Sequence, residues 1–300
     1  MYDLVIVGAG PAGITAGVYA ARKRMNFLIV TKDIGGQTAW SGDIENYIGY
    51  QFITGPELVE KFRDHLHKFN VALREGEPVI LIQRQDNIIK LKTEKGEYEA
   101  KSVIVASGRM QRKLGAEGEE KYRNRGVTYC ATCDGPLFAD MDVAVVGGGN
   151  SGFDAVLQLV NIAKKISVIE SGPEIKADRI IVDKAKESGK VEIYTGSRVE
   201  SIYGDMFVKG IKIRRGNEQM DFPVRGVFIE IGSLAVSSIV KDVKTNPSGE
   251  IIVDCKCRTN IPGIFAAGDV TDVPAKQIIV ACGEGCKALL GAFEYLSAWK

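Results

Sequence analysis

The stretch DLVIVGAGPAG at residues 3–13 decides the fold of this chain, and DVAVVGGGNSG at residues 142–152 repeats it. Each stretch is a short apolar run, then Gly-x-Gly-x-x-Gly, then an apolar helical pattern. In such a fingerprint the first glycine allows a tight turn, the second lets the backbone approach a pyrophosphate, and the third lets the helix pack closely on the strand. The N–H groups at the start of the helix then bind the phosphates. Two copies predict two nucleotide-binding units of one type.

The end of the second strand distinguishes the two predicted sites, because an acidic residue there usually holds the ribose. In the first unit this position is Thr31, so the motif alone does not say which nucleotide binds. In the second unit the strand ends in Glu170. A carboxylate accepts a hydrogen bond from a free 2′-hydroxyl and repels a 2′-phosphate, which favours NADH over NADPH. The alternative is that Glu170 is an ordinary acid at a strand end.

Periodicity predicts an α/β chain. Strands are expected at residues 4–7, 27–30, 79–83, 88–92, 98–106, 143–146, 166–170, 191–194 and 264–267, with further short strands between 199 and 231. Helices are expected at residues 12–24, 54–69, 152–163, 177–188 and 277–296. Residues 109–126 are polar and charged, and we interpret them as a linker.

The composition fits a soluble globular protein and excludes several functions. The 300 residues suggest two domains, and a net charge of +1 argues against a broad basic surface for nucleic acid. We find no apolar run long enough to span a membrane and no secretory signal, so we expect a cytoplasmic protein with mostly reduced cysteines. Its only histidines, His65 and His67, are two positions apart on a predicted helix, which leaves almost no room for a Ser-His-Asp triad.

The candidate reaction centre is Cys130-Ala131-Thr132-Cys133, followed by Asp134. At a helix start or turn, C-x-x-C brings two sulfurs within reach of each other, and one thiol pKa falls to anywhere from ~3.5 to 7.5. The pair can then cycle between dithiol and disulfide, and Asp134 can move the proton that this exchange requires. The alternatives are an inert pair and half of a zinc site.

Four more cysteines accompany this pair. A zinc site needs two further ligands, which Cys255 and Cys257 could supply, although C-x-C is a less usual zinc spacing. Cys282 and Cys286 are four residues apart on the final predicted helix and share a face. We interpret all four as small apolar residues of the interior, with a second redox pair as the alternative.

Seven motifs occur in an order that resembles the low-molecular-weight thioredoxin reductases: GAGPAG, GGQ, ENYIG, ASG, CATCDG, GGGNSG and GIFAAGDV. The resemblance runs over the whole chain. It implies two Rossmann-like, three-layer ββα dinucleotide-binding domains, one inserted into the other. The FAD-binding domain would comprise residues 1–112 and 244–300, and an NAD(P)H-binding domain with the thiol pair would comprise residues 113–243. It also implies a homodimeric FAD enzyme that passes electrons from a pyridine nucleotide to a protein disulfide.

The resemblance assigns roles to individual residues. Those that would contact FAD are Gly8, Gly10, Pro11, Ala12 and Gly13 at the pyrophosphate, Thr31, Gly36, Gln37 and Asn46 along the cleft, Gly268 and Asp269 at the ribityl chain, and Gln277 and Ile278 near the ring. Those that would contact NADH are Gly147, Gly149, Asn150, Ser151, Gly152 and Glu170. Cys133 would lie over the flavin, Cys130 would attack the partner protein, and Asp134 would be the acid/base.

The stretch ESGPEIKAD, which begins at Glu170, stands where the NADPH-using members carry a run of His and Arg. This stretch, with the C-terminal tail, resembles the flavoprotein component of bacterial alkyl hydroperoxide reductase, an NADH enzyme. That component has an additional N-terminal thioredoxin-like region, so we expect a separate thioredoxin- or glutaredoxin-like protein as the electron acceptor here. Three alternatives remain: a related flavoprotein fed by ferredoxin or deazaflavin, an enzyme like ferredoxin–NADP reductase, and a non-catalytic zinc protein.

Overall fold

A computed structural model describes residues 1–41 and 43–299, which form two compact units. The first unit is Met1–Met110 with Leu234–Lys300, and the second is Gln111–Ser233. The two crossings of the chain between them, β9 (Arg109–Gln111) and β18 (Ser233–Ala235), pair with each other. The second boundary lies earlier than the one predicted at residue 243. Val240 is buried in the core of the first unit, and the Lys241 N–H donates to the Ile82 carbonyl over 2.9 Å, so this segment packs there.

The first unit is built on a seven-stranded sheet in the order β5-β2-β1-β8-β7-β6, with β19 also paired to β8. Strand β1 (Tyr2–Ala9) is central and lies parallel to β2 (Phe27–Ile34) and β8 (Glu97–Val105). Leu4 and Ile6 face one hydrophobic core, and Val5 and Val7 face another. Because both faces of β1 are buried, its sequence is continuously apolar rather than alternating.

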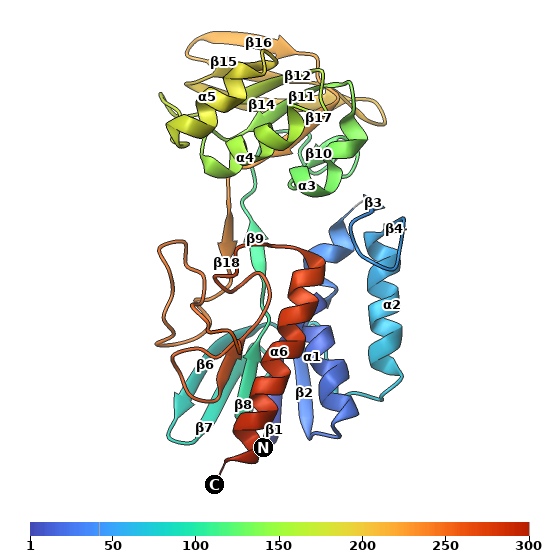
Figure 1. The fold of residues 1–300 in the computed structure, drawn as a ribbon, viewed down its shortest axis with the longest axis vertical. Helices are drawn as coiled ribbons and strands as arrows, with labels where there is room; N and C mark the ends of the chain where they lie inside the picture. Colours follow the sequence, from blue (N-terminus) through green and yellow to red (C-terminus); the bar gives the residue numbers. More distant parts are fainter. Residues whose placement is uncertain (42, 300) are drawn as a thin grey trace. The chain divides into compact units, whose positions relative to one another are not determined.

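Three helices and a short 3-10 helix accompany this sheet. They are α1 (Pro11–Arg22), η1 (Gly36–Trp40), α2 (Gly55–His67) and α6 (Ile278–Ser297). The remaining strands are β3 (Asp43–Ile44), β4 (Ile53–Thr54), β5 (Leu73–Arg74), β6 (Val79–Gln85), β7 (Ile88–Thr93) and β19 (Ile264–Ala266). Helices α1 and α6 lie side by side (Figure 1). They approach closely because Gly285 has no side chain: a Cβ there would fall on the backbone of Ala12.

The second unit has a five-stranded parallel sheet in the order β10-β17-β11-β12-β13 and an antiparallel sheet of three strands, β14-β15-β16. Its strands are β10 (Val127–Thr128), β11 (Asp142–Val146), β12 (Lys165–Ile169), β13 (Val191–Tyr194), β14 (Ser197–Gly204), β15 (Val208–Arg215), β16 (Glu218–Phe222) and β17 (Gly226–Ile229). Its helical segments are α3 (Ala131–Asp134), η2 (Gly135–Phe138), α4 (Asn150–Leu159) and α5 (Arg179–Glu187).

The parallel sheet of the second unit lies between helices and the antiparallel sheet (Figure 1). Val143 and Val145 of β11 face α4 and α5, whereas Ala144 and Val146 face the three-stranded sheet. The predicted fold class, α/β with two Rossmann-like ββα units of which one is inserted into the other, is therefore confirmed. Among the described residues, no helix combines the length and apolar character needed to cross a membrane.

The polar stretch that the sequence suggested as a linker, residues 109–126, is largely folded into the second unit. Glu119 is buried, and its carboxylate accepts hydrogen bonds from the Leu114 and Gly115 N–H groups over 2.9 and 2.7 Å and from the Tyr129 hydroxyl over 2.7 Å. Tyr122 is only 2% exposed. The linker interpretation was wrong because these polar groups satisfy one another inside the unit.

Candidate redox site and dinucleotide-binding loops

Cys130 and Cys133 form a disulfide, as the C-x-x-C spacing predicted, with their Cα atoms 5.3 Å apart. Cys130 is the N-cap residue of α3, and both cysteines are half-buried. The backbone N–H of Cys133 donates to the Cys130 sulfur over 3.2 Å. Such a donor stabilises a thiolate on Cys130 once the disulfide is opened.

Asp134 is connected to Cys130 through a threonine that sequence reasoning missed. The Thr128 hydroxyl donates to the Asp134 carboxylate, and the Cys130 N–H donates to the Thr128 oxygen over 3.2 Å. Thr128 therefore holds the predicted acid/base residue beside the disulfide. No sequence signal marks Thr128, because it lies on a two-residue strand outside the C-x-x-C motif.

The disulfide packs on the helix that begins at the second fingerprint. The Thr132 hydroxyl donates to the Gln158 side chain of α4 over 2.7 Å, and Ala131 is buried in one core with Phe153 and Val156 of that helix. The second fingerprint and the thiol pair are thus parts of one folded unit and share α4 as a support.

The second fingerprint has the geometry that a bound dinucleotide needs. A Cβ on Gly152 would fall on the Gly147 carbonyl oxygen, so only glycine allows this close packing of helix on strand. A Cβ on Gly149, by contrast, would meet no protein atom within 4 Å. The open space beside Gly149, at the N-cap of α4, is where the backbone would approach a pyrophosphate.

Glu170 directly follows β12, and its carboxylate lies against the fingerprint loop. It accepts hydrogen bonds from the Gly148 N–H over 2.6 Å and from the Gly172 N–H over 2.5 Å. These bonds fix the carboxylate and leave further lone pairs for a ribose hydroxyl, because a carboxylate has about four acceptor sites. The Asn150 side chain is occupied within the protein, since its oxygen accepts from the Asp178 N–H over 2.8 Å, and Ser151 is exposed.

The first fingerprint repeats this geometry at the start of α1. A Cβ on Gly13 would fall on the Gly8 carbonyl oxygen, whereas a Cβ on Gly10 would meet no protein atom within 4 Å. Gly36 and Gly268 lie close by. A Cβ added to Gly36 would be 3.6 Å from the Gly10 Cα, and one added to Gly268 would be 3.1 Å from the Ala12 Cβ. Pro11 is the first residue of α1. These predicted FAD residues therefore meet at one helix terminus, and the open space beside Gly10 fits a dinucleotide phosphate.

The other predicted FAD residues lie in pairs or have protein partners. The Asn46 amide donates to the Gln277 side chain over 3.3 Å, and the Gln37 amide donates to the Arg109 carbonyl over 3.0 Å. Ile278 packs against the cluster of Ile44, Ile53 and Leu58. The buried Thr31 hydroxyl donates to the Asp33 carbonyl over 2.6 Å and accepts from the Ala9 N–H over 3.1 Å. Thr31 thus ties together the ends of β1 and β2.

Asp269 follows β19 at the same end of the first unit. Burial raises the pKa of its carboxyl, and Lys276 and Arg109 partly offset that shift. Glu284, which is 5% exposed on α6, holds the turn before Asp269 by accepting from the Gly268 N–H over 3.0 Å and from the Thr271 hydroxyl over 3.1 Å. Sequence reasoning missed Glu284, although an acid in the apolar stretch IIVACGEGCKALL is a detectable signal.

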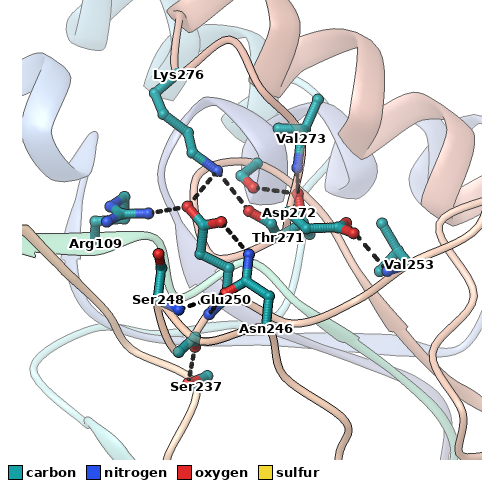
Figure 2. A network of polar contacts seen from close by, with 12 residues as sticks. Arg109, Ser237, Asn246, Ser248, Glu250, Val253, Thr271, Asp272, Val273 and Lys276 are labelled. Atoms are coloured by element: carbon teal, nitrogen blue, oxygen red, sulfur yellow. Dashed lines mark hydrogen bonds and ion pairs between the residues drawn. The ribbon is translucent and has the colours of Figure 1, made fainter. Parts of the chain in front are cut away.

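A polar network anchors the point at which the chain leaves the first unit, and Figure 2 shows its members. Arg109 forms an ion pair with Glu250, and Lys276 Nζ lies 3.1 Å from the same carboxylate. The Asn246 amide also donates to Glu250 over 2.6 Å. Burial would raise the pKa of Glu250, but the hydrogen bonds from Asn246 and Lys276 prevail and lower it. Residues so far apart in the chain give no local signal of this contact.

The four remaining cysteines differ in exposure. Cys257 is fully buried, as predicted, and burial raises its pKa to about 12. Cys255 is exposed, so its interpretation as an interior residue was wrong; it lies in a turn closed by the hydrogen bond from the Cys257 N–H to the Asp254 carbonyl. Cys282 and Cys286 are half-buried. In the described part of the chain, no cluster of three or more His, Cys, Asp or Glu residues is arranged to hold a metal ion.

Two fingerprint loops and a disulfide at a helix start are the features of a dinucleotide-dependent disulfide oxidoreductase. The profile of the pyridine nucleotide-disulphide oxidoreductase family matches residues 2–285, and the chain belongs to this family. Family membership implies FAD and a nicotinamide dinucleotide, NAD(H) or NADP(H), as cofactors.

Relatives of two kinds are similar to the chain. The F component of alkyl hydroperoxide reductase from Staphylococcus aureus (strain MSSA476) is 41% identical over 300 residues, which cover 98% of this chain and 59% of that protein. The corresponding Escherichia coli protein is 39% identical and is covered to 58%. The chain thus spans about three fifths of the length of these relatives. The crystal structure of thioredoxin reductase from Streptococcus pyogenes has a TM-score of 0.94 and 42% identity, with 99% of each chain covered.

Proposed function

We propose that this chain is a flavoenzyme of the thioredoxin-disulfide reductase type. It would transfer electrons from NADH through FAD and the Cys130–Cys133 pair to a thioredoxin- or glutaredoxin-like protein. The observation that carries the proposal is the disulfide at the start of α3, packed on the helix of the second fingerprint. A dithiol–disulfide pair and a dinucleotide site within one unit are the parts that such a transfer requires.

FAD would be held by the first unit, with its pyrophosphate in the open space beside Gly10 and its ribityl chain near Asp269. When bound, FAD supplies a group that accepts a hydride and passes on two electrons. The side chains of Asn46 and Gln277, which bond to each other, and Ile278 beside them would line the ring. Glu284 would act indirectly by fixing the turn at Gly268.

The thiols would carry the electrons to the partner protein. Two electrons break the Cys130–Cys133 bond, and one proton on one sulfur leaves a thiol and a thiolate. The Cys130 thiolate, stabilised by the Cys133 N–H, attacks a disulfide of the partner and forms a mixed disulfide. Cys133 then closes the internal disulfide again and releases the partner as a dithiol. Asp134, held by Thr128, would give and take the proton.

NADH is the proposed electron donor because Glu170 faces the fingerprint loop with a fixed carboxylate. That carboxylate would accept from the ribose 2′-hydroxyl and repel a 2′-phosphate. The acceptor is proposed as a separate thioredoxin-like protein, and the enzyme as a homodimer, on the resemblance to thioredoxin reductases.

The replacement Cys130→Ser tests the proposed function. We expect the variant to retain flavin bleaching by NADH under anaerobic conditions and to lose turnover with thioredoxin-like disulfide proteins. Cys255→Ser is the matched control, because Cys255 is exposed in the other unit, and it should keep both activities. Disulfide turnover in Cys130→Ser would remove the thiol pair from the reaction. A flavin that NADH does not bleach in the wild type would indicate a ferredoxin- or deazaflavin-fed enzyme instead.

A further inference from the structure

Glu250, to which the motifs assign no role, is linked to two segments that carry proposed FAD residues. Gln37 belongs to η1, and residues 269–277 lie in the loop that connects β19 to α6. Both segments belong to the first unit. Figure 2 shows the Glu250 carboxyl group between Arg109 and Lys276, and each of these cations leads to one of the two segments.

Arg109 connects Glu250 to η1. Its guanidinium forms an ion pair with the Glu250 carboxylate, and the two side chains are only 12% and 14% exposed. The backbone carbonyl of Arg109 accepts the hydrogen bond from the Gln37 amide over 3.0 Å. A shift of Arg109 would therefore move the group that holds the Gln37 side chain.

Lys276 connects Glu250 to the loop of residues 269–277. Its ammonium lies 3.1 Å from the Glu250 carboxylate and donates to the Thr271 carbonyl over 2.5 Å. Thr271 lies near the start of this loop, and Lys276 directly precedes Gln277, the N-cap of α6. The two contacts of the ammonium therefore close the loop and hold it against Glu250.

Neighbouring groups hold the Glu250 carboxylate in place. The Asn246 amide donates to this carboxylate over 2.6 Å, while the Glu250 N–H donates to the Asn246 side-chain oxygen over 3.0 Å. The next residue, Ile251, forms backbone hydrogen bonds with the loop, over 2.9 Å with Val270 and over 3.0 Å with Asp272. Removal of the carboxylate would leave two mostly buried cations without their shared anion.

We infer that Glu250 is a positioning residue for FAD: its carboxylate, paired with two cations, sets the spacing between Gln37 and the loop of residues 269–277. The inference rests on the placement of FAD in the proposed function. Glu250 acts through its two cationic partners, which hold the segments of the FAD site in place before the cofactor binds. Loss of this arrangement should therefore increase the rate at which FAD leaves the protein.

The rate of FAD release from the holoenzyme tests this inference. Each protein is diluted into an excess of a phosphodiesterase that hydrolyses free FAD to FMN and AMP, and the rise in flavin fluorescence follows the release. Glu250→Gln and Lys276→Met should each release FAD about tenfold faster than the wild type. The double variant should release FAD no faster than the faster single variant, because either change frees the same loop.

Lys101→Met is the matched control. The Lys101 side chain is 27% exposed, against 25% for Lys276, and it forms an ion pair with Asp3 over 2.7 Å. This pair lies at the start of β1, whereas the first fingerprint begins at the end of that strand. We expect Lys101→Met to release FAD at the wild-type rate, so a difference between the two lysine variants reports on the FAD site rather than on stability in general.

Two results would overturn the inference: release at the wild-type rate in Lys276→Met, or an additive effect of about a hundredfold in the double variant. Lys276→Met keeps the Arg109–Glu250 ion pair, so it decides the question even if Glu250→Gln does not fold. Either result would leave the proposed function standing, because the wild type would still hold FAD. A wild-type protein that neither contains nor takes up FAD would reject the proposed function and this inference together.

Discussion

The replacement Gly149→Ala separates the role of the second fingerprint in binding from its role in folding. A Cβ at this position meets no protein atom within 4 Å, so it fills space that the protein itself leaves open. Gly149 is the N-cap of α4, where alanine is less favourable than glycine. We therefore expect the variant to lose only about 0.5–1 kcal/mol of unfolding free energy.

Binding of the dinucleotide should respond much more strongly. If the pyrophosphate approaches the backbone at Gly149, the new methyl group occupies its place, and we expect the Kd for NADH to rise about tenfold or more, equivalent to ~1.4 kcal/mol. Gly152→Ala is the opposite case. Its Cβ would fall on the Gly147 carbonyl, so overpacking should destabilise the second unit by about 1–3 kcal/mol or more.

The assay is anaerobic stopped-flow bleaching of the flavin as a function of NADH concentration, with thermal unfolding measured on the same samples. Gly96→Ala is the matched control, because its Cβ also meets open space but lies outside both fingerprints. We expect Gly96→Ala to match the wild type in both measurements. An unchanged dependence on NADH in a well-folded Gly149→Ala variant would refute the placement of the dinucleotide at this loop.

Two further predictions concern carboxylates. Glu170→Gln replaces an acceptor of the Gly148 and Gly172 N–H groups and removes the negative charge. We therefore expect kcat/KM for NADH to fall about tenfold and kcat/KM for NADPH not to fall. Equal losses for both donors would contradict this role of Glu170. Glu250→Gln should lower the unfolding free energy at pH 7 by about 2–3 kcal/mol, because the mostly buried Arg109 loses its ionic partner. The folded state lowers the pKa of Glu250 below its ordinary value of 4.5, so this stabilisation exists above that pH and disappears as the pH falls through the lowered value. Denaturant unfolding of both proteins at pH 7 and at a series of pH values below 4.5 checks this, and a difference between them that does not shrink on acidification would contradict it.

Sequence patterns predict the elements that build the nucleotide-binding units, because local signals determine them. The apolar run at residues 4–7 lies within β1, and the predicted helix at 277–296 corresponds to α6. The signal fails where polar groups satisfy one another through the tertiary structure. The polar residues 109–126 predicted a linker, although Glu119 and its partners bond to one another in the folded unit. The short segment around Val240 was predicted as part of the inserted unit, although its contacts lie in the other.

The candidate site divides in the same way. The thiol pair and Glu170 carry their chemistry in motifs, so the sequence predicts them. A motif does not show which groups the side chains of Thr31 and Asn150 contact. In the structure both side chains form hydrogen bonds within the protein. Arg109 and Glu250 are 141 residues apart, so no local sequence pattern predicts this ion pair.

The end of the central strand β11 explains why two acids of the second unit can behave differently. Glu170 follows β12 and Glu230 follows β17, the two neighbours of β11, and the fingerprint loop leaves β11 between them. The Glu170 carboxylate accepts from two backbone N–H groups, which fixes its position for holding a ribose. Burial raises the pKa of the Glu230 carboxyl to about 7. Two carboxyl groups that follow the two neighbours of β11 can thus serve different tasks, because their surroundings differ. Glu170 would thus be the acid of this unit that recognises the donor.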